Sequence, residues 1–262
     1  MRLVFKRCFL LVGMLAFAFD DTAIAQHYGS SVVGTNFDYI TDADPSCFES
    51  VESQGVGKFE MPDKTADREL FQPAYGFLAK YKDGTKVHLA IDAEFESEAA
   101  ARKEADKYLV RLGKLPTALR KGVERLVLHR GHPDTTAFSD QGLIVVYSDN
   151  ASRRIQTHDL EETLFHESVH AAWDAEHRNS KAWKQAQEAD GVFVTNYARK
   201  NPRTEDLAES ALFAFTLIHH PDRIPSKDAA EIRTAIRARI RFVETLLPKD
   251  EPLIYDVEDA KD

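Results

Sequence analysis

Hydrophobic and polar residues alternate along the first half of the chain in the way expected for a small β-sheet. Two alternating runs within residues 75–95 flank Asp83-Gly84, a pair that favours a tight turn, so this segment is predicted to form a two-stranded hairpin. Apolar residues then recur at helical spacing over residues 97–112. We expect this helix to end at Gly113, because glycine commonly terminates helices.

Two further strands are predicted before the pattern changes. Residues 123–129 alternate like a strand, with Val123, Arg125, Val127 and His129 on one side. Residues 143–147 are apolar throughout, which indicates a strand buried on both faces. These segments predict a small sheet with the helix over residues 97–112 on one of its faces.

The second half of the chain has a helical pattern and no further strand signal. The first helix is expected from residue 157 or 159 to 177, where Asp159 and Glu162 resemble a capping box. A second helix is expected over residues 201–220, because it starts with Asn-Pro, a favourable beginning for a helix. A third is expected over residues 227–247, whose apolar stripe is typical of core packing.

The first 25 residues have the order of a secretory signal peptide. Three basic residues precede an apolar run over residues 8–19, and the small-residue segment 23–25 follows. That run is shorter than the roughly 20 residues of a membrane-spanning helix. We therefore expect cleavage near Ala25, a secreted or periplasmic protein, and no membrane span in the mature chain.

Composition limits the partners and the domain organisation. The formal net charge is −9, and it becomes −10 when three basic and two acidic residues leave with the signal peptide, which disfavours nucleic acid as a partner. Residues 26–69 mix Gly, Ser, Asp and Pro with few periodic apolar positions, so we expect a loosely structured extension. Residues 70–262 are expected to form one domain, and the protein is expected to be a monomer.

Cys47 is the only cysteine left after removal of the signal peptide, so no internal disulfide is possible. We interpret Cys47 as a spare thiol, because nothing around it in the sequence suggests a lowered pKa. The alternative is a thiol that occupies a metal in a latent form.

His166-Glu167-Ser168-Val169-His170 forms an HExxH pattern on the first predicted helix of the second half. Helix residues four apart lie about 6 Å apart along the axis, so both imidazoles can bind one ion. Zinc accepts imidazoles at about 2.0–2.1 Å and keeps a position open for water, whose proton Glu167 can take. The surrounding residues are apolar, and a metal would remove the cost of burying these polar groups. The alternative is that both histidines only form hydrogen bonds in the core.

A hydrolytic zinc site needs a third protein ligand. Asp174 lies a further turn beyond His170, too far along the axis to reach the ion, so we expect it to orient a ligand histidine. Glu205 and Glu209 lie one turn apart on the next predicted helix. Glu205 can complete the tetrahedron while Glu209 accepts a hydrogen bond from a histidine ring, and Glu209 as the ligand stays open. The alternative for this pair is a solvated first turn favoured by the helix dipole.

The order of these motifs resembles one family of zinc peptidases. Residues 166–174, then Tyr197, then residues 205–210 are similar to the catalytic domain of anthrax toxin lethal factor and to the related secreted Pro-Pro endopeptidases, which are zincins with a glutamate ligand. The resemblance covers about residues 143–220. The chain departs from the family at Val169, where the family usually has a small residue, and at Asn201-Pro202.

This resemblance implies an α+β, zincin-like metallopeptidase domain, with a small mixed sheet packed on the HExxH helix and a mainly helical C-terminal half. It implies one Zn²⁺ ion with three protein ligands, a general base and a hydrogen-bond donor to the oxyanion. These are, in order, His166, His170 and Glu205, then Glu167, then Tyr197. The fold class also suggests that residues 143–147 pair with an extended substrate, and an interior strand is the equal alternative.

The function predicted from these residues is a secreted zinc endopeptidase that acts on a peptide or protein substrate. The same site could support a metal hydrolase acting on cell-wall peptide. The alternative outside the enzymes is a zinc-binding protein without turnover. Glu167 argues against that alternative, because a structural zinc site needs no base and is normally closed by four protein ligands.

Overall fold

The computed structural model describes residues 28–64, 70–138 and 141–254 of the chain. The predicted signal peptide, residues 1–25, lies outside the described residues. Within the described ranges, no helix has both the length and the apolar character needed to span a membrane.

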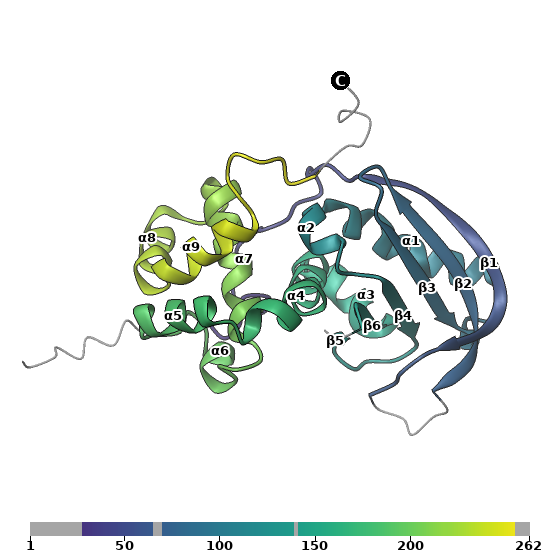
Figure 1. Cartoon of the computed structure of the whole chain (residues 1–262). Helices are drawn as coiled ribbons and strands as arrows, with labels where there is room; N and C mark the ends of the chain where they lie inside the picture. The colour runs from purple at the N-terminus through teal and green to yellow at the C-terminus, as the bar shows by residue number, and fades with distance from the viewer. Residues whose placement is uncertain (1–27, 65–69, 139–140, 255–262) are drawn as a thin grey trace, which may run out of the picture.

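A six-stranded mixed sheet forms one side of the molecule (Figure 1). Its order is β1-β2-β3-β4-β6-β5, where β3, β4 and β6 are parallel to one another and the remaining pairs are antiparallel. The described strands are β1 (Phe48–Glu60), β2 (Phe71–Tyr81), β3 (Lys86–Asp92), β4 (Arg125–His129), β5 (Thr136–Phe138) and β6 (Leu143–Tyr147).

Helix α4 lies between this sheet and the mainly helical C-terminal half (Figure 1). It contacts β5 and β6 on the sheet side and α7 on the other, while α1 contacts β1, β2 and β3. The α+β class and the mixed sheet are therefore confirmed, and the zincin-like identity stays a prediction. The described α-helices are α1 (Glu98–Lys114), α2 (Thr117–Arg120), α3 (Ser148–Gln156), α4 (Leu160–Trp173), α5 (Lys181–Asp190), α6 (Asn196–Lys200), α7 (Asp206–His219), α8 (Ser226–Ala235) and α9 (Arg237–Leu246).

The predicted hairpin and the helix after it are confirmed by β2, β3 and α1. Gly84 has a φ of 79° in the turn, a conformation that glycine adopts at low cost. Gly113 lies inside α1 rather than after its end. A Cβ at this position would lie 2.2 Å from Ser46 Oγ, so Gly113 allows a close approach of two segments and does not terminate the helix.

Strand β6 is buried on both faces, as its sequence predicted. Alternate residues Ile144 and Val146 belong to the main core, while Val145 and Tyr147 belong to a smaller cluster on the opposite face. Of the two alternatives for residues 143–147, the interior strand is confirmed and pairing with a substrate is wrong, because β4 and β5 pair with the two sides of β6. Strand β5 lies at that edge of the sheet.

The expectation of a loosely structured segment over residues 26–69 does not hold for residues 48–60. These residues form β1, an edge strand of 13 residues that pairs with β2. The strand was missed because its residues are mostly polar and because Gly55, with a φ of 77°, lies at a shift in pairing register. Tyr28 and Tyr39 from the same segment are buried in the main core.

The helix boundaries in the second half differ from the predicted ones. Helices α3, α5 and α6 were not predicted, and α7 begins at Asp206 instead of near Asn201-Pro202. The third predicted helix is divided into α8 and α9, because Ile236 leaves helical geometry with a ψ of 40°. The predicted stripe is nevertheless buried, at positions Ile232, Ile236, Ile240, Val243 and Leu247.

The capping box predicted at the start of α4 does not form. Asp159 accepts a hydrogen bond from Arg154 Nη1 at 3.0 Å, and Glu162 Oε1 accepts one from the backbone N of Ile40 at 3.2 Å. Glu162 is 2% exposed, and its Oε2 has no hydrogen-bond partner. Glu162 therefore makes a tertiary contact, whereas the partners of Asp159 are the nearby Arg154 and Thr157.

Glu162 gives a prediction about the pH dependence of stability. Burial raises the pKa of Glu162 from its usual range to about 8. An acid whose pKa is raised on folding destabilises the fold progressively as pH rises from the unfolded value towards the folded one. We expect Glu162→Gln to be more stable than wild type at pH 8 by a few kcal/mol, and to lose this advantage at pH 4. Urea unfolding of both proteins at the two pH values measures this, and an advantage independent of pH would contradict it.

Candidate metal centre

The two histidines of the HExxH pattern lie on the face of α4 that meets α7. His166 is 7% exposed and His170 is partly buried, one helical turn further on. Their Nε2 atoms are 3.2 Å apart. The i, i+4 spacing thus brings two imidazole nitrogens together, as expected for residues on one helical face.

Glu205 brings a carboxylate oxygen to the same point. It immediately precedes α7, and its Oε2 lies 3.4 Å from His166 Nε2 and 3.3 Å from His170 Nε2. Each of these residues offers one ligand atom to a common point, so the group could bind a metal ion. Glu205, the first of the two carboxylates considered from the sequence, is the one that approaches both Nε2 atoms.

The spacing of these three atoms fits a tetrahedral metal. Zinc bonds of about 2.0–2.1 Å to nitrogen or oxygen place neighbouring tetrahedral ligands about 3.3 Å apart. The three separations here are 3.2, 3.3 and 3.4 Å. A donor set of two imidazoles and one carboxylate is also suited to zinc.

The electrostatics of the group favour a bound cation. Burial lowers the pKa of His170, but Asp174 and Glu205 outweigh that effect and raise it to about 10. Burial alone would raise the pKa of Glu205. The contacts with His166 and His170 outweigh burial and hold this pKa well below its usual range. A proton on one imidazole can bridge only two of the three atoms, whereas a divalent ion binds all three.

Asp174 contacts His170, and its role in orienting a metal ligand stays a prediction. It follows α4 directly, in a single π-helical turn over Asp174–Arg178, and its Oδ2 lies 2.9 Å from His170 Nδ1. Arg178 Nη1 donates to the same oxygen at 2.7 Å. A carboxylate on Nδ1 favours the tautomer with its proton there, which leaves Nε2 free to bind a metal.

Glu209 faces the other histidine. Its Oε1 lies 3.6 Å from His166 Nδ1, and its side chain is fully buried on the first turn of α7. Three hydrogen bonds to this carboxylate come from Ser30 and Ser31, far away in the sequence. Nothing local in the sequence indicated these serines, so sequence reasoning missed them.

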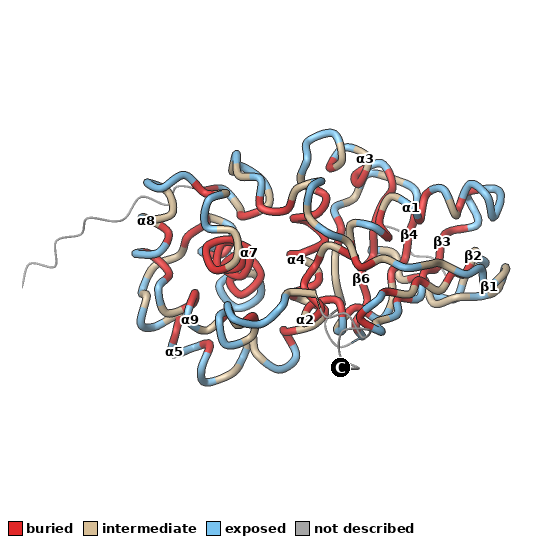
Figure 2. Tube along the Cα trace, turned by 90° about the horizontal axis from the view of Figure 1, so that it is seen from above, coloured by how far each residue is buried: buried red, intermediate tan, exposed pale blue. Residues whose placement is uncertain are grey.

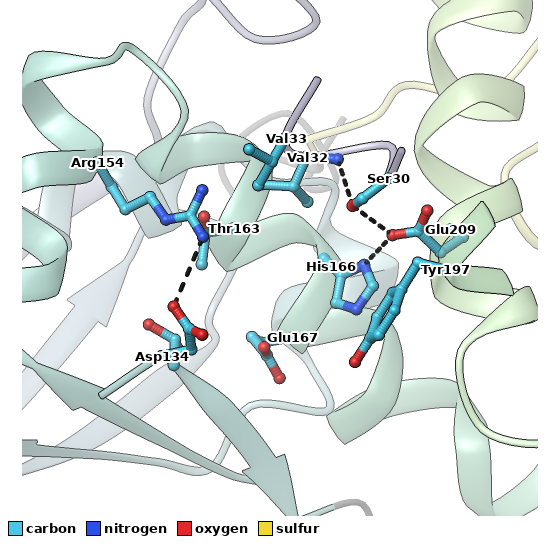
Figure 3. Close-up of a pocket in the computed structure, with 11 residues that line it drawn as sticks. Ser30, Val32, Val33, Asp134, Arg154, Thr163, His166, Glu167, Tyr197 and Glu209 are labelled. Atoms are coloured by element: carbon cyan, nitrogen blue, oxygen red, sulfur yellow. Dashed lines mark hydrogen bonds and ion pairs between the residues drawn. The ribbon is translucent and has the colours of Figure 1, made fainter. Parts of the chain in front are cut away.

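Glu167 is partly buried and lines a cleft of about 280 Å³ beside His166. Burial raises the pKa of its carboxyl group, and the neighbouring histidines oppose that effect. In Figure 3, Glu167 lies between Tyr197 on one side and Asp134 with Arg154 on the other. Glu167 therefore faces the space that a small molecule or a peptide segment could enter.

Tyr197 lies on α6 and lines the same cleft, with 42% of the residue exposed. Burial, followed by the carboxylates of Glu205 and Glu167, raises the pKa of Tyr197 to about 12. The phenol therefore keeps its proton at neutral pH and can donate a hydrogen bond. The cleft residues that sequence reasoning did not single out are Ser30, Val32, Val33, Asp134, Thr135, Arg154 and Thr163.

The cysteine and the other histidines of the described segments belong to different surroundings. Cys47 is buried near the ion pair of Asp83 and Arg120, and burial raises the pKa of its thiol to about 11. The structure thus gives Cys47 the surroundings of a spare core thiol. His129 is buried at the end of β4, with its Nδ1 3.1 Å from Asp92 Oδ2.

A metal site at His166, His170 and Glu205 is therefore supported by the distances between their ligand atoms in this structure. The resemblance to the glutamate-ligand zincins stays a prediction. No family model, curated protein or solved structure matches the chain.

Proposed function

We propose that the protein is a zinc-dependent endopeptidase that is secreted or exported to the periplasm. The observation that carries this proposal is the convergence of His166 Nε2, His170 Nε2 and Glu205 Oε2, 3.2–3.4 Å from one another, beside Glu167 in an open cleft. Three protein ligands are typical of a catalytic zinc site, because they leave a position for water or substrate.

Each residue has a distinct task in this proposal. His166, His170 and Glu205 hold the ion, which when bound supplies a Lewis acid and makes a nearby water more acidic. Glu167 accepts the proton of the attacking water and can then pass it to the leaving amine. Tyr197 donates a hydrogen bond to the oxygen on which negative charge develops.

The cleft supports an extended peptide as substrate. It is bordered by Asp134 and Thr135, which directly precede the edge strand β5. A substrate segment that pairs with the outer side of β5 would be held through its main chain. We therefore assign substrate pairing to β5 in place of β6. Main-chain pairing suits an endopeptidase because it is largely independent of side chains.

Two alternatives use the same metal group. A hydrolase of cell-wall peptide would need the same ligands and base, and differs only in the substrate that enters the cleft. A zinc-binding protein without turnover would need the ligands but no base. Glu167 favours hydrolysis, because a carboxylate with a raised pKa facing an open cleft has no purpose in a structural zinc site.

Metal removal tests the proposal. We expect the purified protein to hold one zinc ion per chain and to cleave members of an unbiased peptide library. A chelator should abolish cleavage. Added zinc should restore it, because all three proposed ligands belong to the chain itself. Bound zinc without cleavage of any peptide would favour one of the two alternatives. Cleavage of peptidoglycan fragments would then indicate the cell-wall hydrolase, and no cleavage of them would indicate the binding protein. A protein that binds no zinc would contradict the proposal.

A further inference from the structure

A segment far from the metal centre in sequence lies against it in space. Residues 28–33, here called the N-terminal strap, run beside α6 and α7 and line the cleft with Val32 and Val33. Figure 3 shows Ser30 of this strap next to Glu209, and Glu209 next to His166. The strap is therefore part of the wall of the site.

The strap provides the hydrogen bonds of a buried carboxylate. Ser30 Oγ donates to Glu209 Oε1 at 2.9 Å, and Ser31 Oγ donates to the same oxygen at 3.1 Å. The backbone N of Ser31 donates to Glu209 Oε2 at 2.7 Å. Ser31 and Glu209 are fully buried, so water does not replace these donors. Buried carboxylate oxygens without such donors would lack hydrogen-bond partners, which is costly.

The carboxylate in turn faces a metal ligand. His166 Nδ1 is buried, has no hydrogen-bond partner within 3.5 Å, and lies 3.6 Å from Glu209 Oε1. A carboxylate at this position favours the proton on Nδ1, which leaves Nε2 free to bind a metal. His170 obtains the same assistance from Asp174, which Arg178 contacts. The strap donates hydrogen bonds to the Glu209 carboxylate beside His166, just as Arg178 donates to the Asp174 carboxylate beside His170.

The strap itself is fixed at several points. The backbone O of Tyr28 accepts from Asn196 N at 3.0 Å, and Tyr28 Oη donates to Asp228 at 2.8 Å. The backbone O of Gly29 accepts from Tyr197 N, also at 3.0 Å. The ring of Tyr28 also packs against Phe213 of α7. These contacts keep the two serines at a defined distance from Glu209.

We propose that Ser30 and Ser31 are positioning residues of the metal centre, which hold the Glu209 carboxylate against the His166 ring and thereby increase the affinity for zinc. This inference rests on the metal centre of the proposed function but not on peptide cleavage. Loss of a partner that orients a zinc ligand typically weakens metal binding by about 10–100-fold.

The test measures zinc affinity by competition with a chromogenic chelator. We expect the double variant Ser30→Ala/Ser31→Ala to bind zinc at least about 10-fold more weakly than wild type. Ser30→Ala alone removes one donor from a partly buried site, should fold normally, and should weaken binding in the same direction by a smaller factor. The matched control is Thr216→Val, which removes a fully buried hydroxyl from α7, the helix that carries Glu209; this hydroxyl donates to the backbone O of Leu212 at 3.0 Å.

The possible results separate the inference from the proposed function. Weaker zinc binding by the serine variants, with wild-type affinity in Thr216→Val, supports the positioning role. Unchanged affinity in the serine variants overturns it, and so does an equal loss in Thr216→Val, which would indicate general destabilisation. If wild type binds zinc but cleaves no peptide, the peptidase proposal fails while this test still stands. If wild type binds no zinc, both fail together.

Discussion

Replacing Glu167 with Gln is expected to lower kcat/KM for peptide cleavage by about 10²–10⁴-fold, the usual contribution of a general base. The amide cannot accept the proton of the attacking water, although it has almost the same size and can stay in the same cleft. Glu167 is not one of the three converging ligand residues, so zinc content should remain that of wild type. Single-turnover cleavage and metal content of the same samples measure both effects.

The control for this variant is Glu188→Gln, the same chemical change at an exposed position on α5 that does not line the cleft. It should keep wild-type cleavage. If Glu167→Gln cleaved as fast as this control, Glu167 would have no role as the base. Loss of zinc together with cleavage would instead make Glu167 part of the metal-binding machinery.

Local periodicity was sufficient to predict part of the sheet and the spacing of the two histidines. The alternation around Asp83-Gly84 gave β2 and β3, and the continuous apolar run over residues 143–147 gave a strand buried on both faces. Both signals arise from the immediate geometry of a strand, so a single sequence contains them. The i, i+4 pair of His166 and His170 was predictable for the same reason, since one helix determines its spacing.

Long-range contacts explain what the sequence did not reveal. Asp159 and Glu162 have the pattern of a capping box, but the backbone N of Ile40, distant in the sequence, donates to the Glu162 carboxylate instead. The polar strand β1 forms because β2 presents an open edge, which no local pattern in β1 records. The donors to Glu209 come from residues about 180 positions away, so only the folded chain shows them.

The placement of Glu205 depends on a second buried network. Asp206, the next residue, has a fully buried side chain, and its Oδ2 accepts from Arg239 Nε of α9 at 2.9 Å. Arg239 Nη1 also contacts Asp190 Oδ2 at 3.0 Å, at the end of α5. The Arg239 guanidinium lies over the ring of Phe193, 5.2 Å from its centroid. One cation therefore compensates two buried carboxylates and contacts the first residue of α7, a helix that Figure 2 shows as largely buried.

Replacing Arg239 with Met is therefore expected to lower the free energy of unfolding by about 3–5 kcal/mol, because removal of one partner leaves buried charge without compensation. This is a large part of the roughly 5–15 kcal/mol of a typical domain. Urea unfolding of the metal-free protein measures the loss. Arg237→Met is the matched control, since it changes an exposed arginine of the same helix and should alter stability by less than about 0.5 kcal/mol.

A double variant shows whether uncompensated charge is the cause. If the loss in Arg239→Met comes from buried carboxylates without a cation, adding Asp206→Asn should restore part of the stability, because the amide carries no charge and can still accept from Gln187 Nε2, which contacts Asp206 at 2.7 Å. If the loss comes from packing of the arginine against Phe193, the second substitution should make the protein less stable still. The sign of this change therefore separates the two causes. Only the first would make Arg239 the electrostatic anchor of the helix that follows Glu205.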